Sequence, residues 1–206
     1  MLKYKTLIIL DWDDTLFPTT WIIKNNINLT NTNMQNHYIV LFSKLDIILS
    51  QILSKFIKYG QVVIVTNAAS KWVSVSLNIL PLSKELIHDK IFIISAREFC
   101  QEKYPNQMPL WKKFIFKRLV ANYFLDHKLQ NIISIGDADY EFNALLDLYN
   151  ENSLIKNRLL KTIRLLKEPS FDNLIDQLYV LNNSLHKFIR IQKHMDLKFK
   201  DINLDY

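Results

Sequence analysis

Four short apolar runs, each followed by polar side chains, constrain the fold of this chain most strongly. Uninterrupted apolar runs of about five residues are typical of strands that are buried on both faces of a parallel sheet. Helical patterns between the runs indicate βαβ units with right-handed crossovers. The chain therefore predicts an α/β fold. The runs cover residues 6–10, 61–67, 91–94 and 131–135, and a fifth candidate strand covers 162–166.

The helices are predicted from apolar residues that recur at spacings of three and four. The clearest pattern covers residues 38–59, and Gly60 follows at the position of a C-cap. The chain has only two glycines, so we expect Gly60 and Gly136 to lie where the backbone tolerates little else. The Asn-rich segment 19–37 lacks a clear period and predicts a loop. Further helices are expected over 70–80, from 83, and over 111–124, 143–149 and 171–188.

Composition narrows the class of protein. With 206 residues, 49% of them hydrophobic and 22% charged, the chain suits one globular domain. No apolar run approaches the ~20 residues of a membrane span, and Asp11, Asp13 and Asp14 interrupt the apolar region that a signal peptide would need. We therefore expect a cytoplasmic protein without membrane association, and the single cysteine, Cys100, fits a reducing compartment. The net charge of +6 is not concentrated in one run, so no specific nucleic-acid binding is expected.

Polar residues follow four of the predicted strands. Because the carboxyl ends of parallel strands face one crevice, these residues are expected to meet there. The carboxylates of Asp11, Asp13 and Asp14 would repel one another and need a cation or a proton nearby. The simpler alternative is an acidic turn that caps the next segment. The polar residues at the strand ends are Asp11 and Asp13, Thr66 and Asn67, Ser95 and Arg97, and Asp137.

Four segments, in order, resemble the motifs of the haloacid-dehalogenase-like (HAD) superfamily of aspartate-nucleophile phosphohydrolases. Asp11-x-Asp13-x-Thr15 is similar to the first motif, VVIVTN to the second, a lysine that opens the helix before the fourth strand to the third, and IISIGDADYE to the fourth. The resemblance covers roughly residues 5–145. It implies a three-layer α/β/α Rossmann-like parallel sheet in a single domain over 1–206, without a separate cap domain and with 16–37 as a flap or loop insertion.

The resemblance also implies a role for each motif residue. A carboxylate can attack phosphorus, and Mg²⁺ suits a site made of oxygens. Asp11 would be the nucleophile and an Mg²⁺ ligand, with Asp137 as the second side-chain ligand. Asp13 would bind Mg²⁺ through its backbone carbonyl and act as acid and base. Thr66 would hydrogen-bond a phosphoryl oxygen, and a lysine would offset the developing charge.

For several roles in the site, more than one residue is a candidate. Lys112 is preferred to Lys113 because it lies nearer the predicted helix start, and Glu141 is preferred to Asp139 as the second acidic residue. Asn67 and Arg97 are candidates for substrate binding, although an ordinary surface ion pair is equally consistent with Arg97. Supporting roles are expected for Thr15, Gly136 and Glu141. Asp14 is interpreted as a turn or capping residue, Trp12 as a residue that could line the site, and Trp21, Trp72 and Trp111 as packing residues.

These interpretations predict an Mg²⁺-dependent phosphatase that hydrolyses phosphomonoesters through an aspartyl-phosphate. A phosphotransferase or phosphomutase would use the same residues, and a non-catalytic binding module of the same fold is the alternative from another class. The segments 16–37 and 95–112 are too short to bury cores of their own, so the site is expected to be open. An open site admits a large phosphorylated partner, such as a phosphoprotein. The oligomeric state is left open.

Overall fold

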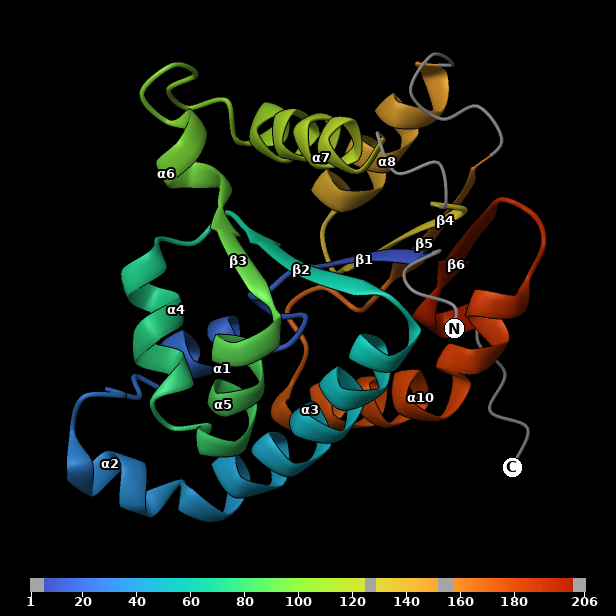
Figure 1. Cartoon of the computed structure of the whole chain (residues 1–206). Helices are drawn as coiled ribbons and strands as arrows, with labels where there is room; N and C mark the ends of the chain where they lie inside the picture. The colour runs from blue at the N-terminus through green and yellow to red at the C-terminus, as the bar shows by residue number, and fades with distance from the viewer. Residues whose placement is uncertain (1–5, 125–128, 152–157, 202–206) are drawn as a thin grey trace.

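Six strands form one sheet in which every pairing is parallel (Figure 1). The computed structural model describes residues 6–124, 129–151 and 158–201. The spatial order of the strands is β3-β2-β1-β4-β5-β6, the order of a doubly wound Rossmann-type sheet. The predicted α/β parallel sheet is therefore confirmed. The strands are β1 (Thr6–Leu10), β2 (Gln61–Thr66), β3 (Phe92–Ser95), β4 (Asn131–Gly136), β5 (Leu159–Arg164) and β6 (Met195–Lys198).

Helices cover both faces of the sheet (Figure 1). On one face lie α6 (Ala96–Cys100), α7 (Met108–Phe124) and α8 (Asp139–Asn150). The other face carries α3 (Ile39–Tyr59), α4 (Ser70–Leu77), α5 (Pro81–Lys90) and α10 (Phe171–Arg190), with α1 (Thr19–Lys24) and α2 (Thr32–His37) beside them. A short 3₁₀ helix, η1 (Phe199–Asp201), follows β6. No helix of the described ranges is long and apolar enough to cross a membrane.

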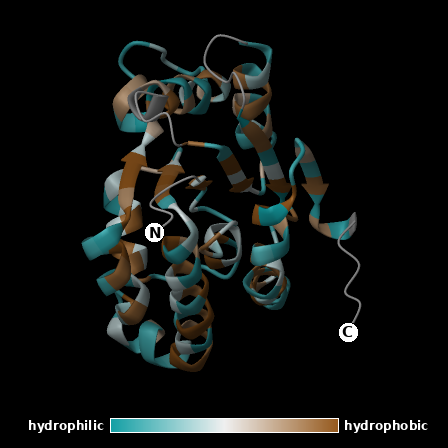
Figure 2. Cartoon of the chain, turned by 45° about the vertical axis from the view of Figure 1, so that its right-hand side comes forward, coloured by the Kyte–Doolittle hydropathy of each residue, from teal (hydrophilic) through white to brown (hydrophobic). Residues whose placement is uncertain are grey.

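Strand residues alternate between two hydrophobic cores, as the pleat requires. In β1, Ile8 and Leu10 pack in the core below α3 and α10, while Leu7 and Ile9 pack in the core below α7 and α8. All four are at most 1% exposed. Figure 2 shows hydrophobic colour on strands of the sheet and mixed colour on the surrounding helices. Burial on both faces explains why this strand reads as a continuous apolar run.

The segment predicted as a loop over 19–37 is instead partly helical. It forms α1 and α2, and Asn31 caps α2 by accepting from the backbone N–H groups of Asn33 and Met34. Ile22, Ile27 and Leu29 are buried in the core under α3. The polar Asn residues hide this pattern in the sequence, because the apolar residues are too few for a visible period.

The last crossover differs from the others in hand. The steps from β4 to β5 and from β5 to β6 run in the same direction across the sheet, yet α8 lies on one face and α10 on the other. The α10 crossover therefore has the opposite hand to the α8 crossover, a departure from the predicted uniform right-handed topology that is rare among parallel strands. The sequence analysis also missed β6, which is short and partly exposed.

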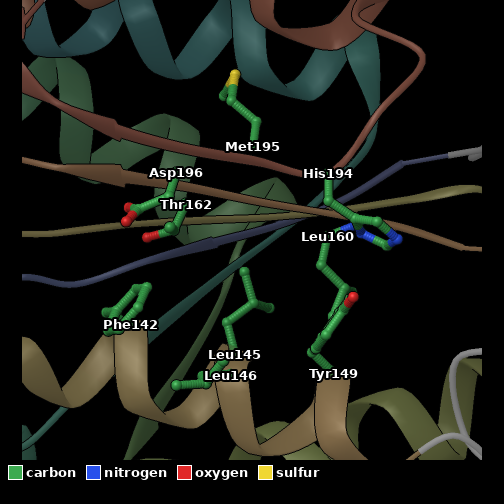
Figure 3. Close-up of a pocket in the computed structure, with 9 residues that line it drawn as sticks. All are labelled: Phe142, Leu145, Leu146, Tyr149, Leu160, Thr162, His194, Met195 and Asp196. Carbon is green, nitrogen blue, oxygen red and sulfur yellow. The ribbon is translucent and has the colours of Figure 1, made fainter.

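This change of hand leaves part of the sheet uncovered. No helix among the described residues follows α8 on its face, and a groove of about 260 Å³ opens between α8 and strands β5 and β6 (Figure 3). Its lining residues with polar side chains are Tyr149, Thr162, His194 and Asp196. None of the residues predicted for the functional site lines it. The groove is lined by Phe142, Leu145, Leu146, Tyr149, Leu160, Thr162, His194, Met195 and Asp196.

Gly60 occupies the predicted C-cap position of α3, but not in the left-handed conformation that glycine usually provides there. Its φ of −172° and ψ of −174° are extended. A Cβ atom at this position would lie 2.2 Å from the carbonyl oxygen of Thr6. Close backbone approach, rather than an unusual φ, therefore requires glycine here.

Candidate functional site

The candidate site lies where the direction of the sheet connections reverses. Asp11 follows β1 and Asp137 follows β4, and these two strands are neighbours. The chain leaves β1 toward β2 on one side and leaves β4 toward β5 on the other. Such a switch point at the carboxyl ends of the strands is where open α/β sheets bind ligands.

A buried lysine joins two acidic residues at this point. Lys112, on α7, places its Nζ 2.8 Å from Oδ1 of Asp11 and also binds Oε1 of Glu141 on α8. The side chains of Lys112, Glu141 and Asp11 are only 1%, 3% and 7% exposed. Helices α7 and α8 pack side by side on one face of the sheet, so the ion pairs tie this layer to the end of β1. An ion pair this deeply buried has little access to solvent screening.

Negative charge exceeds positive charge in this cluster. Burial raises the pKa of Asp11 well above its ordinary value, although the nearby Lys112 ammonium opposes the shift. Burial also raises the pKa of Asp137 to about 7, and the negative charges of Glu141 and Asp14 add to the effect. For Lys112, burial favours the neutral amine, but Asp11 and Glu141 outweigh it and raise the pKa. One lysine thus faces three carboxylates.

Asp13 lies beside this cluster and is held by its own set of donors. Its Oδ1 accepts from the Thr19 hydroxyl at 2.5 Å and from the Trp72 indole N–H at 2.9 Å. Its Oδ2 accepts from the Thr66 hydroxyl at 3.3 Å. Thr66 in turn accepts from the backbone N–H of Ala68 at 2.9 Å. The structure therefore brings Asp13 and Thr66 together, at the ends of β1 and β2.

Asp14 supports the start of α1. Its carboxylate accepts from both the backbone N–H and the hydroxyl of Thr20. Its φ of 53° is left-handed, a conformation that Asp adopts more readily than most residues. Thr15 is fully buried, and its hydroxyl donates to Oδ1 of Asp137 at 3.3 Å. The loop after β1 thus reaches the end of β4 through Thr15.

The remaining candidates divide into two groups. Both side-chain amide atoms of Asn67 are buried and without a hydrogen-bond partner in the described part of the chain, which makes Asn67 a candidate ligand-binding group. Arg97 is exposed on α6, and no hydrogen bond or ion pair within the described residues joins it to Asp11, Asp13 or Asp137. Asp139 is 60% exposed and paired with Lys167, so Glu141 and not Asp139 contacts the lysine of the site.

Gly136 shapes the position of Glu141. A Cβ atom on Gly136 would lie 2.4 Å from Cγ and 2.5 Å from Oε2 of Glu141. The absence of a side chain at the end of β4 therefore leaves room for Glu141 to reach Lys112. Glycine is needed here for space, as at Gly60.

The donors that the sequence motifs imply for Mg²⁺ are all oxygen atoms. Among the described residues, no three His, Cys, Asp or Glu side chains converge as a metal site. The predicted donors, however, are only two carboxylates, Asp11 and Asp137, together with the Asp13 carbonyl. Oε2 of Glu141 is also buried without a hydrogen-bond partner in the described structure. An all-oxygen set with surplus negative charge suits a hard divalent cation.

Known proteins offer no guide to this site. No protein-family model, curated protein or solved structure matches the chain. The class of protein that the fold defines is an α/β protein with a six-stranded parallel sheet between two layers of helices.

Two residues that bind Asp13, Thr19 and Trp72, were not predicted from the sequence as parts of the site. Thr19 lies in a segment that was predicted to be a loop, and Trp72 was interpreted as a packing residue. Their positions follow only from the folded course of α1 and α4, and no sequence signal marked them.

Proposed function

We propose that this protein is a HAD-like, Mg²⁺-dependent phosphatase that hydrolyses phosphomonoesters through an aspartyl-phosphate on Asp11. The observation that carries the proposal is the buried cluster at the switch point, in which Lys112 holds Asp11 and Glu141 while Asp137 adds a third carboxylate. Concentrating carboxylates in a buried place is costly. A site that binds a cation and a phosphoryl group accounts for that cost.

The first half-reaction would transfer the phosphoryl group to the enzyme. Lys112 binds Oδ1 of Asp11 and leaves Oδ2 as the attacking atom. In this proposal Thr66 and Asn67, at the end of β2, would donate to the oxygens of the phosphoryl group, the Thr66 hydroxyl turning from Asp13 to do so. Bound Mg²⁺ would neutralise the charge of Asp11, Asp137 and the phosphate dianion.

The second half-reaction would release phosphate. In this proposal Asp13 gives a proton to the leaving oxygen in the first step and takes one from the attacking water in the second. Lys112 keeps the carboxylate of Asp11 oriented throughout, because Glu141 fixes the ammonium from the other side. Thr15 orients Asp137 through its hydrogen bond.

The central experiment compares Asp11→Asn with the wild-type protein. Purified protein is screened with Mg²⁺ against phosphorylated metabolites and phosphopeptides, and covalent labelling by phosphate is measured on the best substrate. Asp11→Asn should lose both hydrolysis and labelling while remaining folded by circular dichroism. Asp139→Asn is the matched control, because the same change is made at an exposed residue outside the cluster.

Other outcomes would separate the alternatives. Transfer of the phosphoryl group to a second alcohol faster than to water would identify a phosphotransferase or phosphomutase. Binding of a phosphorylated ligand without turnover, unaffected by Asp11→Asn, would identify a non-catalytic module. Near-wild-type turnover by Asp11→Asn would refute the mechanism itself.

The proposal extends to the size of the substrate. Residues 16–37 pack into the core of the domain through Ile22, Ile27 and Leu29, so this segment does not form a separate lid unit. A large phosphorylated partner could supply the missing enclosure. We expect higher kcat/KM for a macromolecular phosphoester than for any small one. Turnover of a sugar phosphate or nucleotide by the monomeric protein at about 10⁵ M⁻¹s⁻¹ would contradict this part of the proposal.

A further inference from the structure

The carboxylate of Asp13 has two oxygens in different environments. Oδ1 accepts two hydrogen bonds, from the Thr19 hydroxyl at 2.5 Å and from the Trp72 indole at 2.9 Å. Oδ2 receives only the longer contact of 3.3 Å from Thr66. The Trp72 indole also lies 3.3 Å from the Thr19 hydroxyl oxygen, so the two donors approach Oδ1 from one side. The oxygen nearer Thr66 is therefore the less constrained one.

Trp72 distinguishes the two oxygens chemically as well as spatially. An indole N–H can donate but cannot accept a hydrogen bond. Oδ1 must consequently remain an acceptor whether the Asp13 carboxyl is ionised or protonated. Because two donors meet Oδ1 and only the 3.3 Å contact meets Oδ2, the proton that Asp13 carries in the proposed reaction is better accommodated on Oδ2, on the side of the strand ends where Thr66 and Asn67 lie.

We propose that Trp72 and Thr19 are positioning residues that fix Oδ1 of Asp13 and thereby direct the proton on Oδ2 toward the leaving oxygen of the substrate. This inference rests on the proposed phosphatase function. It also assigns a role to a tryptophan that sequence reasoning placed only in the packing. The indole is held on α4, whose first residue Ser70 is bound to Glu98, and its ring meets Phe17 edge-on at 6.0 Å.

The step that this arrangement serves is the transfer of the phosphoryl group from the substrate to Asp11. A carboxylate oxygen of Asp11 forms a bond to phosphorus while the bond from phosphorus to the leaving oxygen breaks. The electron pair of that bond stays on the leaving oxygen, which takes the proton from Oδ2 of Asp13. An alcohol leaves, Asp11 carries the phosphoryl group, and Asp13 is left ionised to accept a proton from the attacking water in the next step.

The arrangement favours one class of substrate. An aliphatic alkoxide is a poor leaving group and needs a proton as it departs, whereas p-nitrophenolate leaves readily as an anion. A fixed proton donor therefore matters most for phosphate esters of aliphatic alcohols. We infer that such esters, for example on serine or threonine side chains, are the substrates that this site suits.

The test compares two tryptophan variants on two esters. Trp72→Phe removes the N–H and keeps an aromatic ring. Trp12→Phe is the matched control, because the Trp12 indole donates to Ser76 at 3.0 Å instead of to Asp13, and Trp12 stacks on the same Phe17 ring. kcat/KM is measured for a phosphoserine peptide and for p-nitrophenyl phosphate, since kcat/KM reports the first phosphoryl transfer and not the later hydrolysis.

The expected signature is a selective loss. Trp72→Phe should lower kcat/KM for the phosphoserine peptide by about 10–100-fold, within the range that general acid catalysis contributes, and change it by less than about threefold for p-nitrophenyl phosphate. Trp12→Phe should change both esters by the same factor. Thr19→Val should reproduce the selective loss. Thr19→Ser keeps the hydroxyl, so its kcat/KM for the phosphoserine peptide should stay close to the wild-type value. These two variants keep the test available if Trp72→Phe does not fold.

A measurement on the free protein provides a second readout. The indole N–H resonance of Trp72, assigned by its loss in Trp72→Phe, should shift when Asp13 becomes Asn, while the Trp12 resonance should stay in place. An equal loss on both esters, no loss at all, or an unmoved Trp72 resonance would overturn the positioning role. Wild-type protein that lacks Asp11-dependent turnover would instead refute the proposed function, so the two failures are distinguishable.

Discussion

Two lysines of this protein are almost inaccessible to solvent, and their surroundings differ completely. Lys112 is 1% exposed and binds the carboxylates of Asp11 and Glu141. Lys161 is 0% exposed and donates to the backbone carbonyls of Phe188 and Ile189, each at 2.9 Å. Within the described residues, Lys161 has no carboxylate partner. One ammonium group is surrounded by charge and the other by neutral dipoles.

The difference shows in the pKa values. Burial lowers the pKa of Lys161 to about 8, because no negative charge compensates for lost hydration. For Lys112 the two carboxylates outweigh burial and raise the pKa. Lys161 binds the last turn of α10, where the helix dipole favours a cation. Burial of a lysine therefore does not indicate a functional site by itself, and the proposal rests on the buried carboxylates around Lys112.

The strongest test of this comparison replaces each lysine by Met. Lys112→Met leaves two buried carboxylates without their cation, so the free energy of unfolding at pH 7 should fall by about 3–5 kcal/mol. Lys161→Met removes two hydrogen bonds, which destabilises the fold, but it also removes a buried charge, which offsets part of that loss. The free energy of unfolding should therefore fall by about 1 kcal/mol. Urea unfolding monitored by circular dichroism measures both. Equal losses would mean that the carboxylates of the site do not depend on Lys112.

A second prediction concerns Mg²⁺, which should bind beside the carboxylates near Lys112 and not near Lys161. At 100 times its dissociation constant, Mg²⁺ should raise the free energy of unfolding by about 2.7 kcal/mol. The gain should persist in Lys161→Met and disappear in Asp137→Asn. Thermal unfolding with and without Mg²⁺ is the measurement, and an undiminished gain in Asp137→Asn would place the ion elsewhere.

The Mg²⁺ effect should also depend on pH. Because the pKa of Asp137 is raised to about 7 in the fold, the metal-free protein holds a proton there that the unfolded chain releases above pH 3.8. This bound proton raises the free energy of unfolding at acidic pH, and its stabilising effect is lost as the pH rises through 7. Mg²⁺ must displace the proton below pH 7, so its stabilising effect should be larger at pH 8 than at pH 6.

The sequence predicted the fold well where burial is complete. The run of β1 was predicted with its exact ends, and the first five strands were recognised, although β5 begins at Leu159 instead of Thr162. The strand β6 was missed because its four residues, MDLK, alternate between half-buried and exposed and leave no apolar run. The hand of the last crossover depends on which face α10 covers. There α10 packs against α3, and a contact between helices so far apart in the sequence is not visible in local patterns.

At the site, the sequence identified residues that follow strands and missed residues that reach the site from elsewhere. Asp11, Thr66 and Asp137 were predicted to share one crevice because parallel strands end together. Trp72 and Thr19 reach Asp13 from α4 and α1, and their contacts depend on side-chain directions that periodicity does not encode. The first turn of α8 holds Glu141 because this helix begins at Asp139, four residues earlier than predicted.

A third prediction uses pH to separate the lysines. The pKa of Lys161 in the fold, about 8, is lower than its ordinary value of 10.5. The unfolded chain therefore binds the proton more tightly, and the free energy of unfolding should rise between pH 8 and 10.5 by about 2–3 kcal/mol. The rise should be absent in Lys161→Met. Lys112, whose pKa is raised, contributes stability that is lost only above pH 10.5. Burial also raises the pKa of Cys100, so the difference between the wild type and Lys161→Met in urea titrations at pH 7.5 and 10 isolates Lys161.

The smallest effect is expected at Lys113, the neighbour of Lys112 on α7. Adjacent helical residues point about 100° apart, and Lys113 is accordingly 30% exposed, with its Nζ 3.5 Å from Oδ1 of Asp147. Lys117 also binds Asp147, at 2.8 Å, so this carboxylate keeps a partner when Lys113 is removed. Exposed ion pairs of this kind contribute about 0–1 kcal/mol.

Lys113→Ala should therefore change the free energy of unfolding by less than about 0.5 kcal/mol and leave turnover within about twofold of the wild type. Lys112→Ala, measured beside it, should lose turnover by at least about 100-fold, because Asp11 loses the cation that orients it. The pair shares one helix and one substitution, so differences in helix propensity cancel. A larger loss of turnover in Lys113→Ala than in Lys112→Ala would show that the ion pairs of Lys112 stabilise the fold without serving the reaction, and Lys112 would then resemble Lys161.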